Sequence, residues 1–157
     1  MKSNMEINLI CIGKIKEDYI KSGIIEYQKR IKPFCTFNII ELKEVNKYDD
    51  NRNMEEEAKE ILSVIKDNTY LITLEIEGKM LSSVELANLI SDHYTYSSDV
   101  IYFVIGGSAG LSLSVKERSN YHLSFSKMTF PHQLMRLVFT EQLYRALSII
   151  NNMKYHK

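Results

Sequence analysis

The sequence predicts an α/β fold in which a mostly parallel sheet carries helices on both faces. Apolar strand-like runs alternate with amphipathic helical segments along the chain, and the run VIYFVIGGSAG at 100–110 is continuously apolar until it breaks into glycines. Such a run is typical of a central parallel strand covered on both faces. The length of 157 residues, without an apparent repeat or low-complexity tract, predicts a single domain spanning 1–157.

The N-terminal half of the chain supplies the first elements of this pattern. A strand is expected at 5–13 because an apolar run ends at Gly13. A helix at 17–31 follows from apolar residues on one face and from Pro33 just beyond its end. The next elements are a strand at 35–42, a polar loop at 43–53 and a helix at 54–66 with acids in its first turn.

The C-terminal half continues the alternation. A buried strand is expected at 69–79, broken at Gly78, and a helix at 82–94 opens with serine caps. After the apolar strand at 100–105 we expect a short helix at 112–120, a last strand at 121–125 and the longest helix at 131–151.

Charge is balanced over the whole chain but is uneven along it. Lysine plus arginine equals aspartate plus glutamate at 20 each, so a polyanionic partner must be met by a local patch. From residue 116 onward seven basic residues face only Glu117 and Glu141: Lys116, Arg118, Lys127, Arg136, Arg145, Lys154 and Lys157. Two interpretations stay open, a nucleic-acid patch and a solvated surface with charges on different faces.

The cysteines and the N-terminus indicate a cytoplasmic, soluble protein. Cys11 and Cys35 lie in apolar surroundings and are expected to be buried free thiols in a reducing compartment. We see no signal peptide, no membrane span and no cluster with metal-ligand spacing, so neither a membrane nor a metal is expected.

Three strand ends carry unusual loops, at 74–79, 105–110 and 124–131. Ligands of open α/β sheets bind at the carboxyl ends of the strands. In the second loop Gly106, Gly107 and Gly110 permit either a close approach to a ligand or simply a tight turn. Their spacing fits neither a dinucleotide fingerprint nor a P-loop, which disfavours nicotinamide and nucleoside-triphosphate sites.

The segment LSFSKMTFPHQLMR at 123–136 leads from the last strand into the long helix. Its hydroxyl groups and the apolar Phe125, Met128 and Phe130 suit a flat heteroaromatic ligand such as adenine. The alternative is an ordinary capped helix start, since Pro131 suits a first turn.

The long helix and the tail suggest an assembly. A polar stripe, which includes Glu141 and Arg145, leaves a broad apolar arc that predicts a twofold partner. Glu141 and Arg145 also fit an ordinary helical ion pair. In the tail, Tyr155 and His156 combine an aromatic face with a group that titrates near neutrality, and they are placed beside the glycine loop as a hypothesis.

Four segments in order, FVIGGSAGL, LSFSKMTFPHQLMR, EQLYRA and the terminal YHK, resemble the ribosomal RNA large-subunit methyltransferase H family of the SPOUT class. The resemblance covers essentially the whole chain. It implies a C-terminal trefoil knot, a homodimer, and S-adenosylmethionine-dependent methylation of N3 of a pseudouridine in 23S ribosomal RNA. The ribosome, as large subunit or assembled particle, is the implied partner.

The resemblance also implies the site residues. The cofactor-binding positions that match are Leu74, Gly106, Phe125, Ser126, Lys127, Met128, Thr129 and Phe130. The implied catalytic positions are Arg136, Arg145, Tyr155 and His156. We hypothesise that His156, or water held by it, assists deprotonation, and that Arg136 or Arg145 positions a phosphate or the anionic base. Lys154 stands where many members have proline.

Two other functions fit the residues. One is a non-catalytic, dimeric RNA-binding or ribosome-assembly module, which needs the basic C-terminal region but no ligand cradle. The other is a SPOUT methyltransferase that acts on a different RNA. Binding of S-adenosylmethionine separates the first alternative from a methyltransferase.

Overall fold

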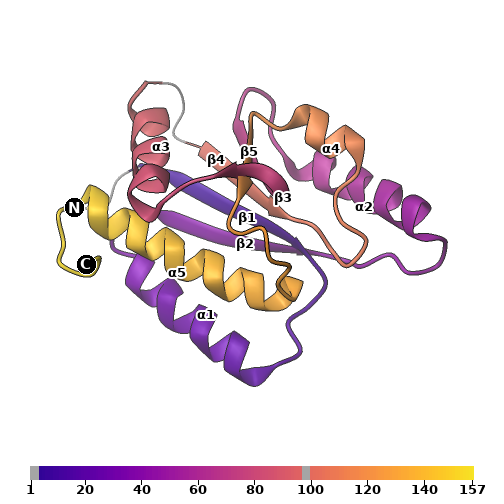
Figure 1. Cartoon of the computed structure of the whole chain (residues 1–157), viewed down its shortest axis with the longest axis horizontal. Helices are drawn as coiled ribbons and strands as arrows, with labels where there is room; N and C mark the ends of the chain where they lie inside the picture. Colours follow the sequence, from indigo (N-terminus) through magenta and orange to yellow (C-terminus); the bar gives the residue numbers. More distant parts are fainter. Residues whose placement is uncertain (1–3, 97–99) are drawn as a thin grey trace.

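The computed structural model describes residues 4–96 and 100–157, and within them strands and helices alternate strictly (Figure 1). The strands are β1 (Glu6–Ile12), β2 (Thr36–Leu42), β3 (Tyr70–Met80), β4 (Val100–Ile105) and β5 (Tyr121–Ser124). The helices are α1 (Asp18–Ile31), α2 (Asp50–Val64), α3 (Ser83–Tyr96), α4 (Leu113–Arg118) and α5 (His132–Ile150). The predicted α/β class is confirmed.

The strands form one sheet in the order β2-β1-β4-β3-β5, and every neighbouring pair is parallel. Strand β4 pairs with β1 on one side and with β3 on the other, as expected for a strand that is apolar throughout. The predicted parallel sheet is therefore confirmed, while the trefoil knot implied by the resemblance stays a prediction.

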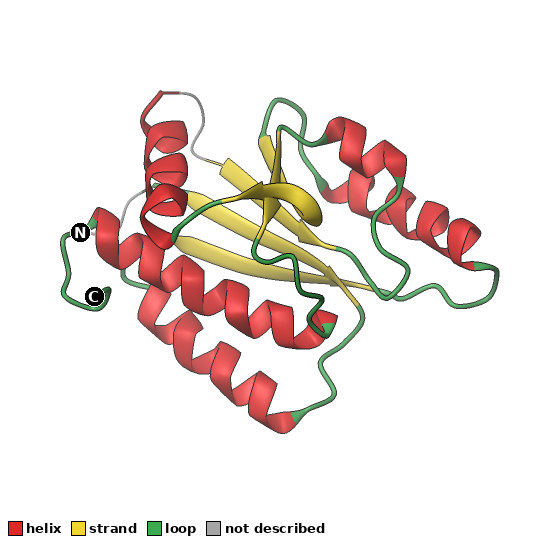
Figure 2. Cartoon of the chain, in the orientation of Figure 1, coloured by secondary structure: helices red, strands yellow, loops and turns green. Residues whose placement is uncertain are grey.

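The sheet lies between two layers of helices (Figure 2). Alternate side chains of β4 point to opposite faces, as the twofold period of a strand requires. Phe103 and Ile105 belong to a core shared with α1, α3 and α5, whereas Tyr102 and Val104 belong to a core shared with α2 and α4. None of the helices in the described residues is both long and apolar enough to cross a membrane.

Helix α2 begins earlier than predicted. The polar segment up to residue 53 was expected to be a loop, but the helix starts at Asp50. The Asp49 carboxylate accepts a hydrogen bond from the backbone amide of Arg52 at 2.9 Å and so caps the first turn. The aspartate pair at 49–50 was the missed sign of a helix start.

Strand β3 does not break at Gly78, which corrects a second boundary. It continues to Met80, and its register against β5 shifts between Leu74 and Lys79, so that both residues lie opposite Leu123. A Cβ atom on Gly78 would lie 2.8 Å from the His122 backbone. Glycine is needed here because two main chains approach closely, and the shift folds residues 75–78 outward from the strand ladder.

The connections after β3 and β4 leave the sheet on opposite faces. Strand β3 leads into α3 in one helix layer, and β4 leads into α4 in the other. Adjacent parallel strands with such diverging connections leave a crevice at their carboxyl ends, where open α/β sheets bind ligands.

Candidate functional site

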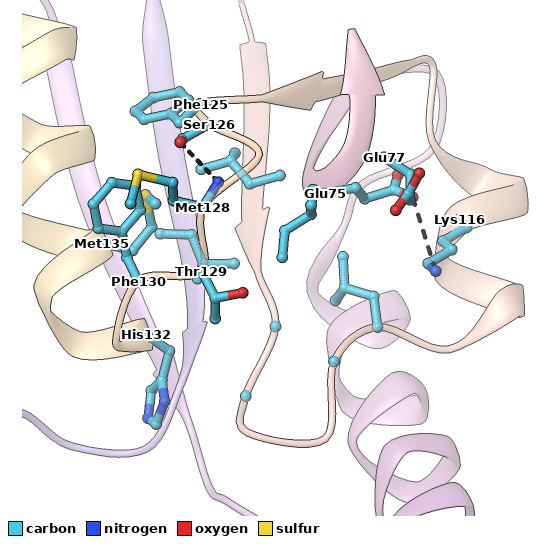
Figure 3. A pocket seen from close by; sticks show the side chains of 17 residues that line it. Glu75, Glu77, Lys116, Phe125, Ser126, Met128, Thr129, Phe130, His132 and Met135 are labelled. Atoms are coloured by element: carbon cyan, nitrogen blue, oxygen red, sulfur yellow. Dashed lines mark hydrogen bonds and ion pairs between the residues drawn. The ribbon is translucent and has the colours of Figure 1, made fainter. Parts of the chain in front are cut away.

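A cavity of about 330 Å³ lies at this crevice, at the carboxyl ends of β3, β4 and β5 (Figure 3). The three strand-end loops predicted from the sequence all contribute to its wall. The predicted cofactor-binding residues that line it are Leu74, Gly106, Phe125, Ser126, Met128, Thr129 and Phe130. Lys127 is exposed and is not part of the wall. The volume falls in the usual range for small-molecule sites.

The loop after β4 is a tight glycine turn that forms one edge of the cavity. The Gly110 amide donates to the Gly107 carbonyl at 3.0 Å, and Gly110 has a φ of +89°. A Cβ on Gly106 would lie 2.9 Å from the Gly110 carbonyl carbon. The turn therefore exists only because these positions lack side chains, and its main chain faces the cavity directly.

The loop between β5 and α5 forms the opposite edge. The Ser126 hydroxyl accepts a hydrogen bond from the Met128 amide at 2.9 Å, which bends the loop. Phe125 packs with its ring centroid 6.2 Å from that of Phe139 in α5, while the Met128 side chain is 74% exposed. Together with Phe130, which is 36% exposed, Met128 gives this edge of the cavity an exposed apolar surface.

A charged wall, which sequence reasoning missed, completes the cavity. The Glu75 side chain is only 13% exposed and accepts a hydrogen bond from the Thr73 hydroxyl at 2.5 Å. His122 Nδ1 also contacts this carboxylate, and Lys116 Nζ lies 3.9 Å from it. The charged side chains lie across the cavity from the β5–α5 loop (Figure 3). An acid directly after the apolar part of a predicted strand was the available sign.

Arg136 is not placed as predicted. Its side chain is fully buried and donates to Glu41 at 2.9 Å and to the carbonyls of Ile12 and Gly13 at 2.5 and 2.8 Å. The guanidinium therefore joins the ends of β1 and β2 to the start of α5. The hypothesis that Arg136 positions phosphate or an anionic base is wrong for this arrangement, because nothing outside the protein reaches it.

Side chains of α1, α5 and the tail itself form a cluster that holds the tail in place. This tail cluster comprises Tyr27 of α1, Glu141 and Arg145 of α5, and Tyr155 and His156 of the tail. The Tyr155 hydroxyl donates to Glu141 at 2.6 Å and lies 3.4 Å from the Tyr27 hydroxyl. Arg145 donates to Glu141 at 2.7 Å and contacts His156 Nδ1 at 3.2 Å. Burial and the bond to Glu141 raise the pKa of Tyr155 above its usual value.

The tail cluster lies far from the cavity of its own protomer. Arg145 follows His132, which lines the cavity, by thirteen helical residues, a rise of about 20 Å. Figure 1 shows the C-terminus at the end of α5 that points away from the β5–α5 loop. The expectation that the tail docks beside the glycine loop is therefore wrong within one protomer.

The basic residues of the C-terminal region do not form one free patch. Arg136 pairs with Glu41, Arg145 pairs with Glu141, and Lys116 lies near Glu75. Arg118 donates to the Thr69 carbonyl at 3.0 Å. Lys127 is exposed at one end of α5, and Lys154 and Lys157 are exposed at the other. A solvated surface with charges on different faces therefore fits the charge pattern better than a single nucleic-acid patch.

The two cysteines and the possible metal ligands remain to be placed. Cys11 and Cys35 are both buried, as predicted, and burial raises the pKa of the Cys11 thiol to about 12. Within the described ranges, no group of three or more His, Cys, Asp or Glu side chains is arranged to hold a metal ion.

The fold and the cavity define an α/β protein whose small-molecule site lies at a switch point of a parallel sheet, with an apolar side, a glycine turn and a charged wall. Comparison with known proteins identifies the family. The family model described as "Predicted SPOUT methyltransferase" matches residues 5–156, and the chain belongs to the SPOUT methyltransferase family.

Relatives of known name are similar over nearly the full length. The chain is 50% identical over 159 residues to the ribosomal RNA large subunit methyltransferase H of Finegoldia magna, covering 98% of this chain and 100% of that protein. It is likewise 50% identical over 155 residues, with the same coverage, to the protein of that name from Fusobacterium nucleatum. A probable methylase family protein of Haemophilus influenzae shares the fold at 16% identity, with a TM-score of 0.53 over 96% of this chain and 70% of that one.

Proposed function

We propose that this protein methylates N3 of a pseudouridine in 23S ribosomal RNA, with S-adenosylmethionine as the methyl donor, in the cytoplasm. One observation carries the proposal: three loops from distant parts of the chain line a single cavity at the strand ends. Membership of the SPOUT methyltransferase family and full-length similarity to the named ribosomal RNA methyltransferases support it.

The cavity fits the donor chemically. Phe125, Phe130 and Met135 offer an apolar side for the adenine ring. The Gly106–Gly110 turn offers main-chain groups without a side chain in the way. Glu75 places a carboxylate in the cavity wall, 3.9 Å from Lys116 Nζ, and this carboxylate is the group there that favours a cationic sulfonium.

The chain's contribution to the reaction is positioning and electrostatics. When bound, S-adenosylmethionine supplies a methyl group whose bond to sulfur breaks as the bond to N3 forms, leaving a neutral thioether. Loops fixed at 74–77, 105–110 and 125–130 hold the donor in one orientation, and such alignment contributes roughly 7–11 kcal/mol to rate acceleration. The apolar side excludes water from the reacting centre.

A homodimer reconciles the cavity with the tail cluster. Reacting atoms must approach to about 3–3.5 Å, which the separation along α5 forbids within one protomer. Partly exposed apolar residues of α5, including Leu134 and Val138, and the exposed Met128 provide a surface for a second copy. We therefore place the tail of one protomer at the cavity of its partner as part of the proposal.

Calorimetry with S-adenosylmethionine tests the donor site. We expect saturable binding to the purified protein, and we expect insertion of one residue between Phe125 and Phe130 to abolish it. Undiminished affinity after the insertion contradicts the proposed site, and no binding to the unaltered protein favours a non-catalytic RNA-binding module instead.

Nucleoside mapping of ribosomal RNA tests the substrate. Mass spectrometry should detect an N3-methylated pseudouridine in 23S RNA from cells with the gene and lose it in cells without it. A methyl group lost from a different nucleotide would support a SPOUT enzyme with another RNA target.

Mixing variants tests the shared site. Gly106→Ala impairs the cavity and His156→Phe impairs the tail, so each homodimer alone should be weakly active. Exchange of subunits produces heterodimers with one intact composite site each, so an equal mixture after random exchange should recover about a quarter of the unaltered activity. Absence of restoration contradicts a site built from two protomers.

A further inference from the structure

The contact between Arg145 and His156 fixes how the histidine can act. The two side chains meet through Arg145 Nη1 and His156 Nδ1 at 3.2 Å. A guanidinium has only donors and is always charged, so the imidazole nitrogen that faces it must accept. His156 Nδ1 therefore keeps its lone pair toward Arg145, and in the neutral ring the proton resides on Nε2.

The rest of the tail cluster holds this pair in place. Glu141 accepts from Arg145 Nη2 at 2.7 Å and from the Tyr155 hydroxyl at 2.6 Å, so one carboxylate holds both Arg145 of α5 and Tyr155 of the tail. The guanidinium also lies over the Tyr155 ring, with its central carbon 4.8 Å from the ring centroid. The arginine is thus fixed from two directions before it meets His156.

The other ring nitrogen is available to a ligand. His156 is half-buried, and across the described residues no hydrogen bond from its Nε2 is found. The charged or titratable groups that face the ring or flank it in the chain are Arg145, Glu141, Tyr155, Lys154 and Lys157, and only Arg145 contacts its nitrogen. The tail therefore presents an N–H donor and no basic lone pair.

We infer that Arg145 and Glu141 are positioning residues that lock His156 in the Nε2–H tautomer, so that His156 acts on the RNA as a hydrogen-bond donor and not as a base. This inference rests on the proposed function and replaces the hypothesis of deprotonation by His156. The acceptor is a carbonyl oxygen next to N3, which gains negative charge when N3 loses its proton. That proton leaves to a solvent base, and the N3 lone pair then forms the bond to the methyl carbon as its bond to sulfur breaks.

Nitrogen NMR of the intact protein labelled with ¹⁵N-histidine measures the tautomer directly. At neutral pH the His156 signals, assigned by their loss in His156→Gln, should show a protonated Nε2 and an unprotonated Nδ1. Arg145→Met should shift both signals toward the averaged values of a ring that exchanges tautomers. Arg30→Met is the matched control, since Arg30 stacks on Tyr27 at 5.1 Å without contacting His156, and it should leave the signals unchanged.

Two substitutions of His156 separate a donor from a base in single-turnover methylation of ribosomes that lack the modification. Glutamine keeps an N–H near the position of Nε2 but does not titrate, so His156→Gln should stay within about tenfold of the unaltered rate. Phenylalanine keeps the ring but has no donor, so His156→Phe should fall by about a hundredfold, as expected for loss of one donor to a developing oxyanion.

Each result decides the inference. Protonation at Nδ1, or an unchanged tautomer in Arg145→Met, overturns the lock by Arg145. Equal rates for the glutamine and phenylalanine variants overturn the donor role. If the unaltered protein methylates no RNA, the proposed function fails, whereas the NMR measurement still decides the tautomer on its own.

Discussion

The two ends of helix α5 each carry an arginine, and the two arginines have different structural roles. At the cavity end, Arg136 is fully buried and bonds to Glu41 and to main-chain carbonyls of β1 and its following turn. At the tail end, the Arg145 side chain is 25% exposed and bonds to Glu141 and His156. The first arginine joins secondary-structure elements, and the second orients the C-terminal tail.

The surroundings of the two helix ends differ in the same way as the two arginines. At the cavity end the fold is fixed by buried groups, while the loops leave apolar side chains such as Met128 uncovered. At the tail end the polar side chains satisfy one another. The difference indicates that the cavity end is built to receive a molecule, and the tail end is built to present one group in a set direction.

The largest expected effect concerns the contribution of Arg136 to the free energy of unfolding. Arg136→Met removes a buried charge and leaves the carbonyls of Ile12 and Gly13 without their donor, so the free energy of unfolding should fall by about 3–5 kcal/mol. Arg145→Met, near the surface, should cost about 1 kcal/mol or less. Urea unfolding at one fixed protein concentration measures both, because a dimer's stability depends on concentration. Equal losses would remove the contrast between the two ends.

The next effect tests the glycine turn at the cavity end. Gly106→Ala places a methyl group against the Gly110 carbonyl, so S-adenosylmethionine should bind about tenfold to a hundredfold more weakly by calorimetry. Ser108→Ala alters an exposed residue of the same turn and should change the affinity by about twofold or less. A loss of about twofold or less in Gly106→Ala as well would show that the turn tolerates a side chain and that S-adenosylmethionine binds elsewhere.

The smallest effect concerns pH at the tail end. The pKa of Tyr155 lies above its usual value of 10.0, so in folded protein the phenol keeps its proton when the unfolded chain loses it. Its stabilising contribution, about 1 kcal/mol for the bond to Glu141, is present below pH 10 and is lost as the pH rises further. The difference in unfolding free energy between the unaltered protein and Tyr155→Phe should therefore shrink above that pH.

A matched control isolates that effect from the other tyrosines. Tyr19 is 65% exposed, and Tyr19→Phe should leave both the stability and its pH dependence nearly unchanged. A Tyr155→Phe difference that stays constant up to strongly alkaline pH would contradict the role of the Tyr155 proton in holding the tail.

The sequence was sufficient for the features that depend on local periodicity. The apolar run at 100–105 predicted the central strand, and the convergence of three strand ends predicted which loops line the cavity. Prediction from local sequence failed where a signal was overlooked, as with the aspartate cap of α2, or where a glycine permits the close approach of two strands, as with Gly78.

Contacts between distant residues could not be predicted in this way. Arg136 shares a helical stripe with Glu141 and Arg145, so spacing gives no reason to bury it, and its partner Glu41 lies 95 residues away. The same holds for Glu75, whose place in the cavity depends on the register shift between β3 and β5. The order of strands in the sheet sets both, and periodicity does not encode that order.

Because α5 supplies Phe139, Leu143 and Ala146 to the larger core, one face of the sheet is covered only by α1 and α3 until α5 has been synthesised. Until α5 has left the exit tunnel, Phe103 lacks its contact with Phe139, whose ring centroid lies 4.7 Å from its own in the folded protein. A truncation before residue 132 therefore exposes the apolar core residues that α5 covers, and we expect it to produce an aggregation-prone fragment in place of a smaller working domain.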